Sequence, residues 1–150
     1  MSASSIQTKQ MLQSSQVQGV WNLVSYVVEV KETGESFAPM GARPTGYAIF
    51  TAEGRLSFTL TAAERQHATT AEERSDLLSS MIAYTGSYRL EKDRWITLVD
   101  VAWNPSWVGT EQTRFYRVEA DQLIVSTPWR VMPNCSEKGI TRSIVRFQRC

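Results

Sequence analysis

The feature that most constrains the fold is a series of about eight short segments dense in β-branched and aromatic residues, several with alternating polarity. The expected strands are 20–31, 47–51, 55–61, 83–90, 95–103, 112–119, 123–127 and 143–148. Several of the connections, such as 52–54, 91–94 and 120–122, are hairpin-sized. Sequential antiparallel strands favour an up-and-down barrel, because closure removes the sheet edges. We therefore expect an all-β fold, whose interior is just wide enough for packed side chains or one small ligand.

Two segments depart from the strand pattern. Residues 5–16 read as a short polar helix, so we divide the chain into an N-terminal helix or tail at 1–18 and a barrel at 19–150. Residues 62–82 are poor in β-branched residues and predict a loop followed by one short helix that ends near Met81. Thr70 is the expected N-cap, with Glu73 three residues later in a capping box.

Composition narrows the class of partner. The 150 residues suffice for one domain with its own core, and a net charge of +1 gives no reason to expect nucleic acid or an anionic membrane as a partner. No stretch approaches the roughly 18 apolar residues of a membrane span, and the N-terminus lacks the apolar core of a signal peptide. We expect a soluble, cytoplasmic protein.

The sequence offers few groups for metal or cofactor chemistry. With His67 as the one histidine, and Cys135 far from Cys150, no zinc site can be assembled from spacing. We expect two reduced thiols, with a disulfide to the C-terminal residue as the alternative. Neither a nucleophile elbow, a phosphate-binding loop nor a dinucleotide fingerprint occurs. An enzyme of this sequence is therefore expected to use no metal and no cofactor.

Alternation predicts which side chains face the barrel interior. The expected inward residues are Trp21, Leu23, Ser25, Val27 and Glu29; Leu56, Phe58 and Leu60; Tyr84, Gly86, Tyr88 and Leu90; and Gln112, Arg114 and Tyr116. In 95–103 neither face is clearly polar. Strand parity places Asp100 opposite Trp103 there, and one β-bulge would exchange their faces.

Three residues are the catalytic candidates. An inward Arg114 is costly unless it pairs with Asp100 or Glu29, or holds a ligand carboxylate, enolate or carbonyl. Tyr84 offers a phenol as a weak general acid, or simply buries its ring. Asp100 lies between two valines, where a carboxylate of raised pKa could transfer protons; the alternative is a salt-bridged structural residue.

A larger set is expected to contact the ligand or to pack in the core. Asn104 begins the turn Trp103-Asn104-Pro105-Ser106-Trp107, where it either caps the backbone or donates its amide to a ligand carbonyl. His67 is expected at the surface, and reaches a ligand only if 62–75 folds over the barrel mouth. We expect three of the tryptophans to cluster near one end of the barrel. The ligand-binding candidates are Tyr47, Phe58, Tyr88, Trp103, Asn104, Trp107, Tyr116 and Trp129.

Gly19-Val20-Trp21 is the G-x-W motif that opens lipocalin-type barrels. Together with PTGYAIFTAEGRLSFTL, IAYTGSYRL and NPSWVGTEQTRFYRVEADQLIVSTP, it makes the chain resemble the lipocalin-like domain family of bacteria and fungi from about Gly19 to Arg149. The resemblance implies a calycin barrel with a central ligand pocket, in which Trp21 plugs the closed end against Arg146 or Arg142. Members often carry paired histidines where this chain has Thr97 and Leu98, so a function that rests on those imidazoles is not expected.

These observations favour a cofactor-independent isomerase or cyclase in natural-product biosynthesis. Its substrate would be a small, apolar, oxygenated metabolite of polyketide or terpenoid type. The alternative is a non-catalytic carrier of a small hydrophobic ligand. A third hypothesis is a barrel filled by its own side chains that acts through its surface, for instance as a homodimer.

Overall fold

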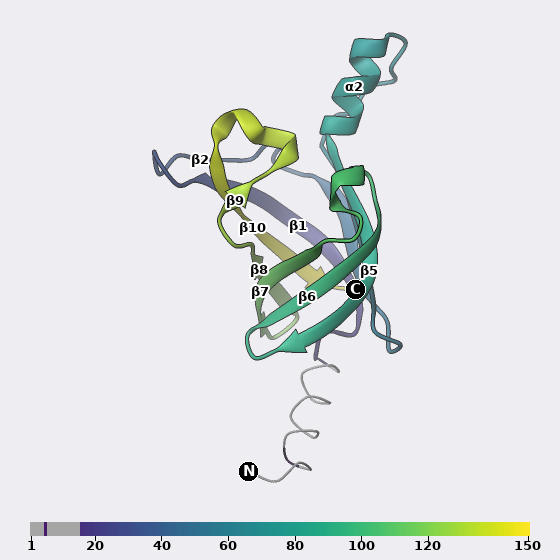
Figure 1. The fold of residues 1–150 in the computed structure, drawn as a ribbon, viewed down its shortest axis with the longest axis vertical. Coiled ribbons are helices and arrows are strands. Elements are labelled where there is room, and N and C mark those ends of the chain that lie inside the picture. The colour runs from purple at the N-terminus through teal and green to yellow at the C-terminus, as the bar shows by residue number, and fades with distance from the viewer. Residues whose placement is uncertain (1–4, 6–15) are drawn as a thin grey trace.

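The fold is seen in a computed structural model that describes residue 5 and residues 16–150 (Figure 1). The predicted helix over 5–16 falls almost wholly outside the described residues. One sheet contains all ten strands, in the order β2-β1-β3-β4-β5-β6-β7-β8-β10-β9. Since β1 also pairs with β10, eight of these strands close into the predicted antiparallel barrel, with β2 and β9 as extra strands.

The strand boundaries follow the predicted segments closely. The strands are β1 (Gly19–Val30), β2 (Ser36–Phe37), β3 (Thr45–Phe50), β4 (Arg55–Thr61), β5 (Met81–Glu91), β6 (Arg94–Ala102), β7 (Glu111–Glu119), β8 (Gln122–Ser126), β9 (Arg130–Val131) and β10 (Ile140–Arg149). The helical elements are α2 (Ala71–Ser79) and two 3₁₀ helices, η1 (Pro105–Trp107) and η2 (Pro133–Lys138). The sequence did not predict the two-residue strands β2 and β9.

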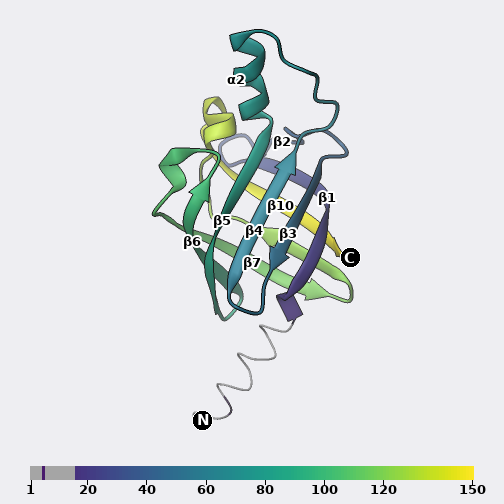
Figure 2. The same cartoon turned by 90° about the vertical axis from the view of Figure 1, so that its right-hand side faces the viewer.

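The helix α2 confirms the prediction of a short helical excursion. The Thr70 side chain accepts a hydrogen bond from the Glu73 backbone N–H, and the Glu73 carboxylate accepts one from the Thr70 N–H, both at 3.1 Å. This is the predicted capping box, which satisfies two N–H groups at the helix start. None of the helix residues is buried, and the helix projects beyond one end of the barrel (Figure 2).

A bulge in β1 changes which residues of that strand face inward. Leu23 pairs with Phe147 and Ser25 pairs with Arg146, so Val24 is an extra residue between them. Inward Trp21 and Leu23 are confirmed as buried. Beyond Val24 the alternation is reversed, because one inserted residue moves every later side chain to the other face. The prediction of an inward Ser25, Val27 and Glu29 is therefore wrong; the buried residues are Tyr26, Val28 and Val30.

A second bulge settles the faces of β6. Thr85 pairs with Val101 and Gly86 pairs with Val99, which leaves Asp100 as the extra residue. Up to this point the side chains of Trp95, Thr97 and Val99 are buried. Asp100 and Val101 are both exposed, while Ala102 and Trp103 are half-buried. Asp100 faces outward, as alternation from the buried Val99 already requires, and the bulge leaves the next residue, Val101, exposed as well.

One end of the barrel is closed by the start of β1 and the end of β10. The Trp21 indole is fully buried and its Nε1 donates to the Val17 carbonyl at 2.8 Å. The Arg149 guanidinium lies over the ring, because Arg149 is the register partner of Trp21 in the β1–β10 pair. The prediction that Arg146 or Arg142 fills this position is wrong, since Arg146 is exposed and Arg142 pairs with Glu29.

Cys135 and Cys150 are free cysteines, in agreement with the two reduced thiols that the sequence predicts. Cys135 is buried and Cys150 is exposed. Over the described residues, no helix combines the length and the apolar character that a membrane span requires.

Candidate functional site

A small cavity lies inside the barrel. Its volume is about 30 Å³. That has room for about two or three water molecules, since each needs roughly 10–15 Å³. Metabolite sites are usually about 300–1,000 Å³. The barrel interior around this cavity is thus largely filled by the protein's own side chains. The cavity is lined by Ala48, Leu56, Phe58, Tyr84, Trp95, Arg114, Val125, Val145 and Phe147.

Arg114 is the charged residue in this lining. It stands on β7 opposite Trp95 of β6, and only 7% of its surface is exposed. Its Nη1 donates to the Thr113 carbonyl at 2.8 Å, and its guanidinium carbon lies 5.8 Å from the centre of the Trp107 ring. The inward orientation is confirmed. The predicted partners are wrong, because neither Asp100 nor Glu29 bonds to it.

Arg114 carries a positive charge that no carboxylate of the described residues neutralises. Among the described residues no carboxylate lies within 4.0 Å of its nitrogens. A buried cation of this kind is unfavourable unless it is hydrogen-bonded or meets an acceptor from outside the chain. One backbone carbonyl leaves most of its five N–H groups free for such an acceptor.

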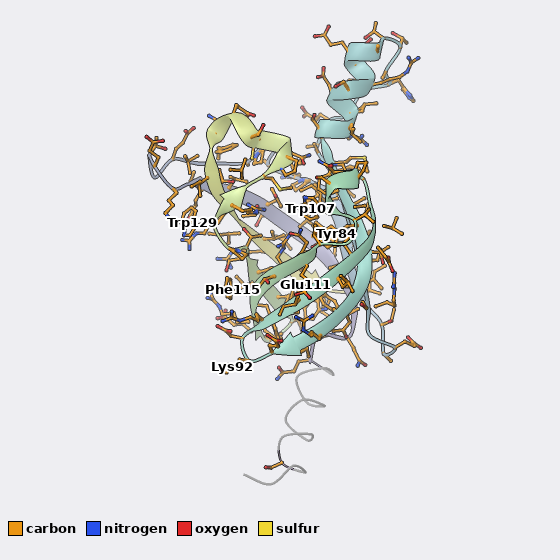
Figure 3. All side chains as sticks on the ribbon, in the orientation of Figure 1. Tyr84, Lys92, Trp107, Glu111, Phe115 and Trp129 are labelled. Atoms are coloured by element: carbon orange, nitrogen blue, oxygen red, sulfur yellow. The ribbon has the colours of Figure 1, made fainter. Side chains whose placement is uncertain are left out.

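An aromatic group forms the wall beside Arg114. Tyr84 lies 5.2 Å from Trp107 between ring centres (Figure 3). Tyr84 also lies 5.7 Å from Phe58, and Trp107 lies 4.9 Å from Trp103. Trp107 is held there by η1, where the Asn104 side chain accepts hydrogen bonds from the Ser106 backbone N–H and hydroxyl. The capping interpretation of Asn104 is confirmed. Tyr84, Phe58 and Trp107 are buried as predicted, and the structure brings them together.

A second aromatic group lies toward the closed end of the barrel. Phe50 packs edge-on against Trp95 at 5.0 Å and Tyr88 at 5.3 Å, and Tyr116 lies 5.2 Å from Trp95. The Tyr88 hydroxyl donates to the Thr51 carbonyl at 3.4 Å. Burial raises the pKa of the Tyr116 phenol, so it stays protonated near neutral pH. Tyr88 and Tyr116 face inward as predicted, but neither lines the cavity, and both pack against the hydrophobic core.

Three of the predicted site residues lie outside the barrel. Asp100 accepts two hydrogen bonds from Arg55, at 2.7 and 2.9 Å, and its side chain is 54% exposed. This partner lowers the pKa of the carboxyl, whereas a proton-transfer role needs it raised. Asp100 is thus a salt-bridged structural residue, as the alternative interpretation predicted. The prediction that Asp100 transfers protons is wrong. Tyr47 is 47% exposed on the outer face of β3, because β3 alternates strictly there.

Trp129 is the third of these residues. Its ring packs against the Arg142 guanidinium at 4.7 Å and lies 5.9 Å from the Lys31 ammonium nitrogen, on the outer surface. Figure 3 shows it away from Tyr84 and Trp107, so the predicted three-tryptophan cluster is wrong and only Trp103 and Trp107 meet. The cause is β9, which the sequence did not predict and which positions the segment after β8 beside β10.

Sequence reasoning missed a second polar group inside the barrel. The Tyr26 hydroxyl and the Ser143 hydroxyl share a hydrogen bond of 2.8 Å, and Arg130 Nη2 donates to the Ser143 oxygen at 3.1 Å. Burial raises the pKa of Tyr26, against the effect of the Ser143 hydrogen bond and the positive charges of Arg130 and Arg114. Tyr26 was assigned to the outer face because no residue type in 20–31 signals the bulge at Val24.

Four buried side-chain polar atoms have no hydrogen-bond partner among the described residues, and two of them are Trp95 Nε1 and Thr97 Oγ1. Leaving such atoms unpaired is costly, typically about 1–3 kcal/mol each. Both come from the inward face of β6, and Trp95 also lines the cavity. They are polar groups that a water or a ligand would satisfy.

The hollows outside the barrel offer fewer groups for binding or catalysis. One of about 270 Å³ lies between 62–67 and α2, and its lining includes His67, which is exposed as predicted. Another, of about 370 Å³, follows the outer face of β4 to β6. Within residue 5 and residues 16–150, no three His, Cys, Asp or Glu side chains gather as metal ligands.

A family model described as lipocalin-like domain matches residues 18–150. None of the curated proteins matches the chain.

Proposed function

The chain belongs to the lipocalin-like domain family, and from this premise we propose that it binds a small hydrophobic ligand inside its barrel. The architecture is consistent with such a ligand, since an eight-stranded barrel can hold one small molecule. The observation that carries the proposal is the buried Arg114, which lines an otherwise aromatic and aliphatic cavity without a carboxylate partner. A ligand oxygen would accept the hydrogen bonds that the protein leaves unmade.

Binding must enlarge the cavity of about 30 Å³. Arg114 is anchored by one hydrogen bond to a neighbouring carbonyl, so its long side chain can change rotamer at little cost. The Trp107 ring stands on a single 3₁₀ turn, a short element compared with the strands that carry the rest of the lining. We infer that these two side chains move when the ligand enters, while the strands keep their pairing.

The test is a fluorescence titration with N-phenyl-1-naphthylamine, a neutral apolar dye. We expect saturable binding that weakens when Ala48→Leu fills the cavity from β3. Val125→Leu adds a smaller group on the opposite side of the cavity. It gives a second test of cavity filling if Ala48→Leu fails to fold. Asp100→Asn on the outer surface is the control. An unsaturable signal, or equal affinity in the filled variants, would contradict binding inside the barrel.

A second candidate function is a cofactor-free isomerase or cyclase for an apolar oxygenated metabolite. What favours it is that Arg114 and Tyr84 line the same cavity. Arg114 would polarise a substrate carbonyl. The Tyr84 phenol would deliver a proton to one substrate position, and the phenolate so formed would take up the proton that another position loses, while the aromatic wall confines the substrate. Asp100 has no part in this scheme.

The reaction is tested by metabolite profiling of the native host with and without the gene. Replacement of a product by an isomer of equal mass, or by an uncyclised precursor, is the expected result for an enzyme. Complementation with Arg114→Gln and Tyr84→Phe would then assign the groups. An unchanged profile beside positive dye binding would contradict catalysis and leave a carrier.

A further inference from the structure

The outer surface of five neighbouring strands carries two rows of uncharged side chains. Strands β1, β3, β4, β5 and β6 lie side by side in the sheet and form one side of the barrel (Figure 2). Their pairing aligns the outward residues across the strands. One row is Val20, Ile49, Ser57, Thr85 and Val101, and the next is Asn22, Tyr47, Thr59 and Ala83. We call these residues the neutral face. The outer side of β7, by contrast, carries the charged residues Glu111, Arg117 and Glu119.

Large and small side chains are segregated on the neutral face. Val20, Tyr47 and Ile49, on β1 and β3, are exposed and form a ridge. The small residues of β4 and β5 lie beside this ridge, and they line part of a hollow of about 370 Å³. Val101 and Trp103, at the end of β6, form the far border of this groove. The face thus combines a protrusion with a recess next to it.

Charged residues lie at one edge of the neutral face, where they neutralise each other. Arg55 and Asp100 form the ion pair described above, and both side chains are about half exposed. Arg55 Nη2 also donates to the Thr85 hydroxyl at 3.5 Å, and that hydroxyl donates to the Leu56 carbonyl at 2.8 Å. Covering the groove would therefore not leave the Thr85 donor unpaired. A less polar centre with charged pairs at its border is typical of protein interfaces.

We propose that the neutral face is the contact surface between two copies of this chain, with the ridge of each copy in the groove of the other. A two-fold axis brings the same patch of both copies together, so the patch must be complementary to itself. A ridge beside a groove meets this condition, because the half-turn that seats one ridge also seats the other. An uncharged face meets its own copy without like-charge repulsion, whereas a strongly basic or acidic partner would find no opposite charge there. The inference does not depend on what the barrel binds.

The size of the neutral face indicates a weak dimer. Thr45, Thr61 and Met81 continue it as a third uncharged row. Five strands about 4.8 Å apart, with outward residues about 6.7 Å apart along each strand, give a footprint on the order of 500 Å² per copy. Two copies together would bury about 1,000 Å², the lower limit for a specific interface. We therefore expect a reversible dimer with a dissociation constant on the order of micromolar.

The test is sedimentation velocity of the full-length protein at total concentrations from about 1 to 200 µM, which span such a dissociation constant. We expect the sedimentation coefficient of the wild type to rise from that of a monomer toward that of a dimer. Ile49→Lys places a charge on the ridge, where it would be buried without a partner, and should weaken association at least about tenfold. Ile140→Lys is the matched control, since it makes the same change at an exposed position on β10, outside the neutral face. This control should associate like the wild type.

A mixture of two variants tests the arrangement of ridge and groove. Thr59→Glu places the opposite charge in the groove, and it should also weaken self-association. Mixed in equal amounts with Ile49→Lys, it should restore dimers, because the Lys ridge of one chain then meets the Glu groove of the other. The second ridge and groove of that mixed dimer are unchanged. Thr59→Glu alone also tests the face if Ile49→Lys does not fold.

Each outcome supports or overturns a defined part of the proposal. A wild-type protein that stays monomeric over the whole concentration range overturns it. A dimer that persists in both Ile49→Lys and Thr59→Glu, or that weakens equally in Ile140→Lys, overturns the assignment to the neutral face. If the single variants dissociate and their mixture forms no dimers, the face is the contact and the ridge-in-groove arrangement is refuted.

Discussion

The guanidinium carbon of Arg149 lies 4.0 Å from the centre of the Trp21 ring, so the last strand covers the side chain that plugs the barrel. Arg149 also donates to the backbone carbonyls of Gln16 and Gln18, at 2.6 and 3.1 Å. These contacts hold the chain that enters β1 against the end of β10. The closed end is thus secured by one cation stacked on one indole.

Replacing Arg149 by Met should lower the free energy of unfolding by about 1–3 kcal/mol, because a cation–π contact and two charged hydrogen bonds are lost together. The measurement is urea denaturation followed by tryptophan fluorescence. Arg146→Met, on the outer face of the same strand, should stay within about 0.5 kcal/mol of wild type. An equal loss in both variants would mean that net charge, rather than the Trp21 contact, is responsible.

At Gly86 the backbone of β6 leaves no room for a side chain on β5. A Cβ built there would lie 2.0 Å from the Leu98 carbonyl oxygen and 3.0 Å from the Val99 Cα. We expect Gly86→Ala to push the strands apart at the Asp100 bulge and to destabilise the protein by about 3 kcal/mol or more. Gly34→Ala is the comparison, because Gly34 has φ +72° and open space, so it should lose only about 1–2 kcal/mol. Thermal or urea unfolding of both variants decides it, and similar losses would contradict tight strand packing at the bulge.

The two bulges explain how far the sequence alone could lead. Strand positions and the Thr70–Glu73 capping box depend on residues a few places apart, so the pattern predicted them. The inward face of β4 was also predicted, because Leu56, Phe58 and Leu60 alternate without interruption. In β1 and β6 an inserted residue reversed the alternation, and nothing in the residue types around Val24 or Asp100 marks the insertion.

Partner choice was the harder problem. Asp100 was one of two carboxylates that the sequence offered as a partner for Arg114, but it bonds to Arg55, which is 45 positions away in the sequence. Such a pair depends on strand order and register, which composition does not encode. The interior group of Tyr26, Ser143 and Arg130 was missed for the same reason, since its members come from β1, β10 and the unpredicted β9.

The Arg55–Asp100 pair should make stability depend weakly on acid pH. Arg55 holds the pKa of Asp100 below its ordinary value near 4, so the pair stabilises the fold above that value. This stabilisation is lost as the pH falls through the lowered pKa of the folded state. Asp100→Asn should reduce the change of the urea midpoint between pH 5 and pH 2. The reduction should be small, because both side chains of the pair are exposed. An unchanged acid profile would contradict a contribution from the pair, and the same variant should leave dye binding intact.

Alkaline pH should destabilise the protein through Tyr26. Burial raises the pKa of its phenol above the ordinary value near 10, so the folded state holds the proton more tightly than the unfolded state. Stability is therefore complete below about pH 10 and is lost progressively above it. Tyr26→Phe should reduce the free energy of unfolding at pH 7 by about 1 kcal/mol, through loss of the Ser143 hydrogen bond, and weaken the decline above pH 10. Urea unfolding at pH 7, 9 and 11 measures both effects, and a parallel decline in both proteins would assign the alkaline sensitivity to other groups.

Thr97 and Thr127 make a matched pair of buried threonines that differ in one respect. The Thr97 hydroxyl has no partner among the described residues, whereas the Thr127 hydroxyl accepts a hydrogen bond from the Ser143 backbone N–H at 2.9 Å. Valine keeps the shape of either side chain and removes its oxygen. Thr97→Val should therefore leave the free energy of unfolding unchanged or raise it by up to about 1 kcal/mol. Thr127→Val should lower it by about 1–3 kcal/mol, because the Ser143 N–H is left buried and unpaired.

If Thr97→Val is as damaging as Thr127→Val, the Thr97 hydroxyl is bonded in solution. Dye binding then identifies its partner: an affinity that falls in Thr97→Val and not in Thr127→Val points to the ligand, and an unchanged affinity points to a structural water.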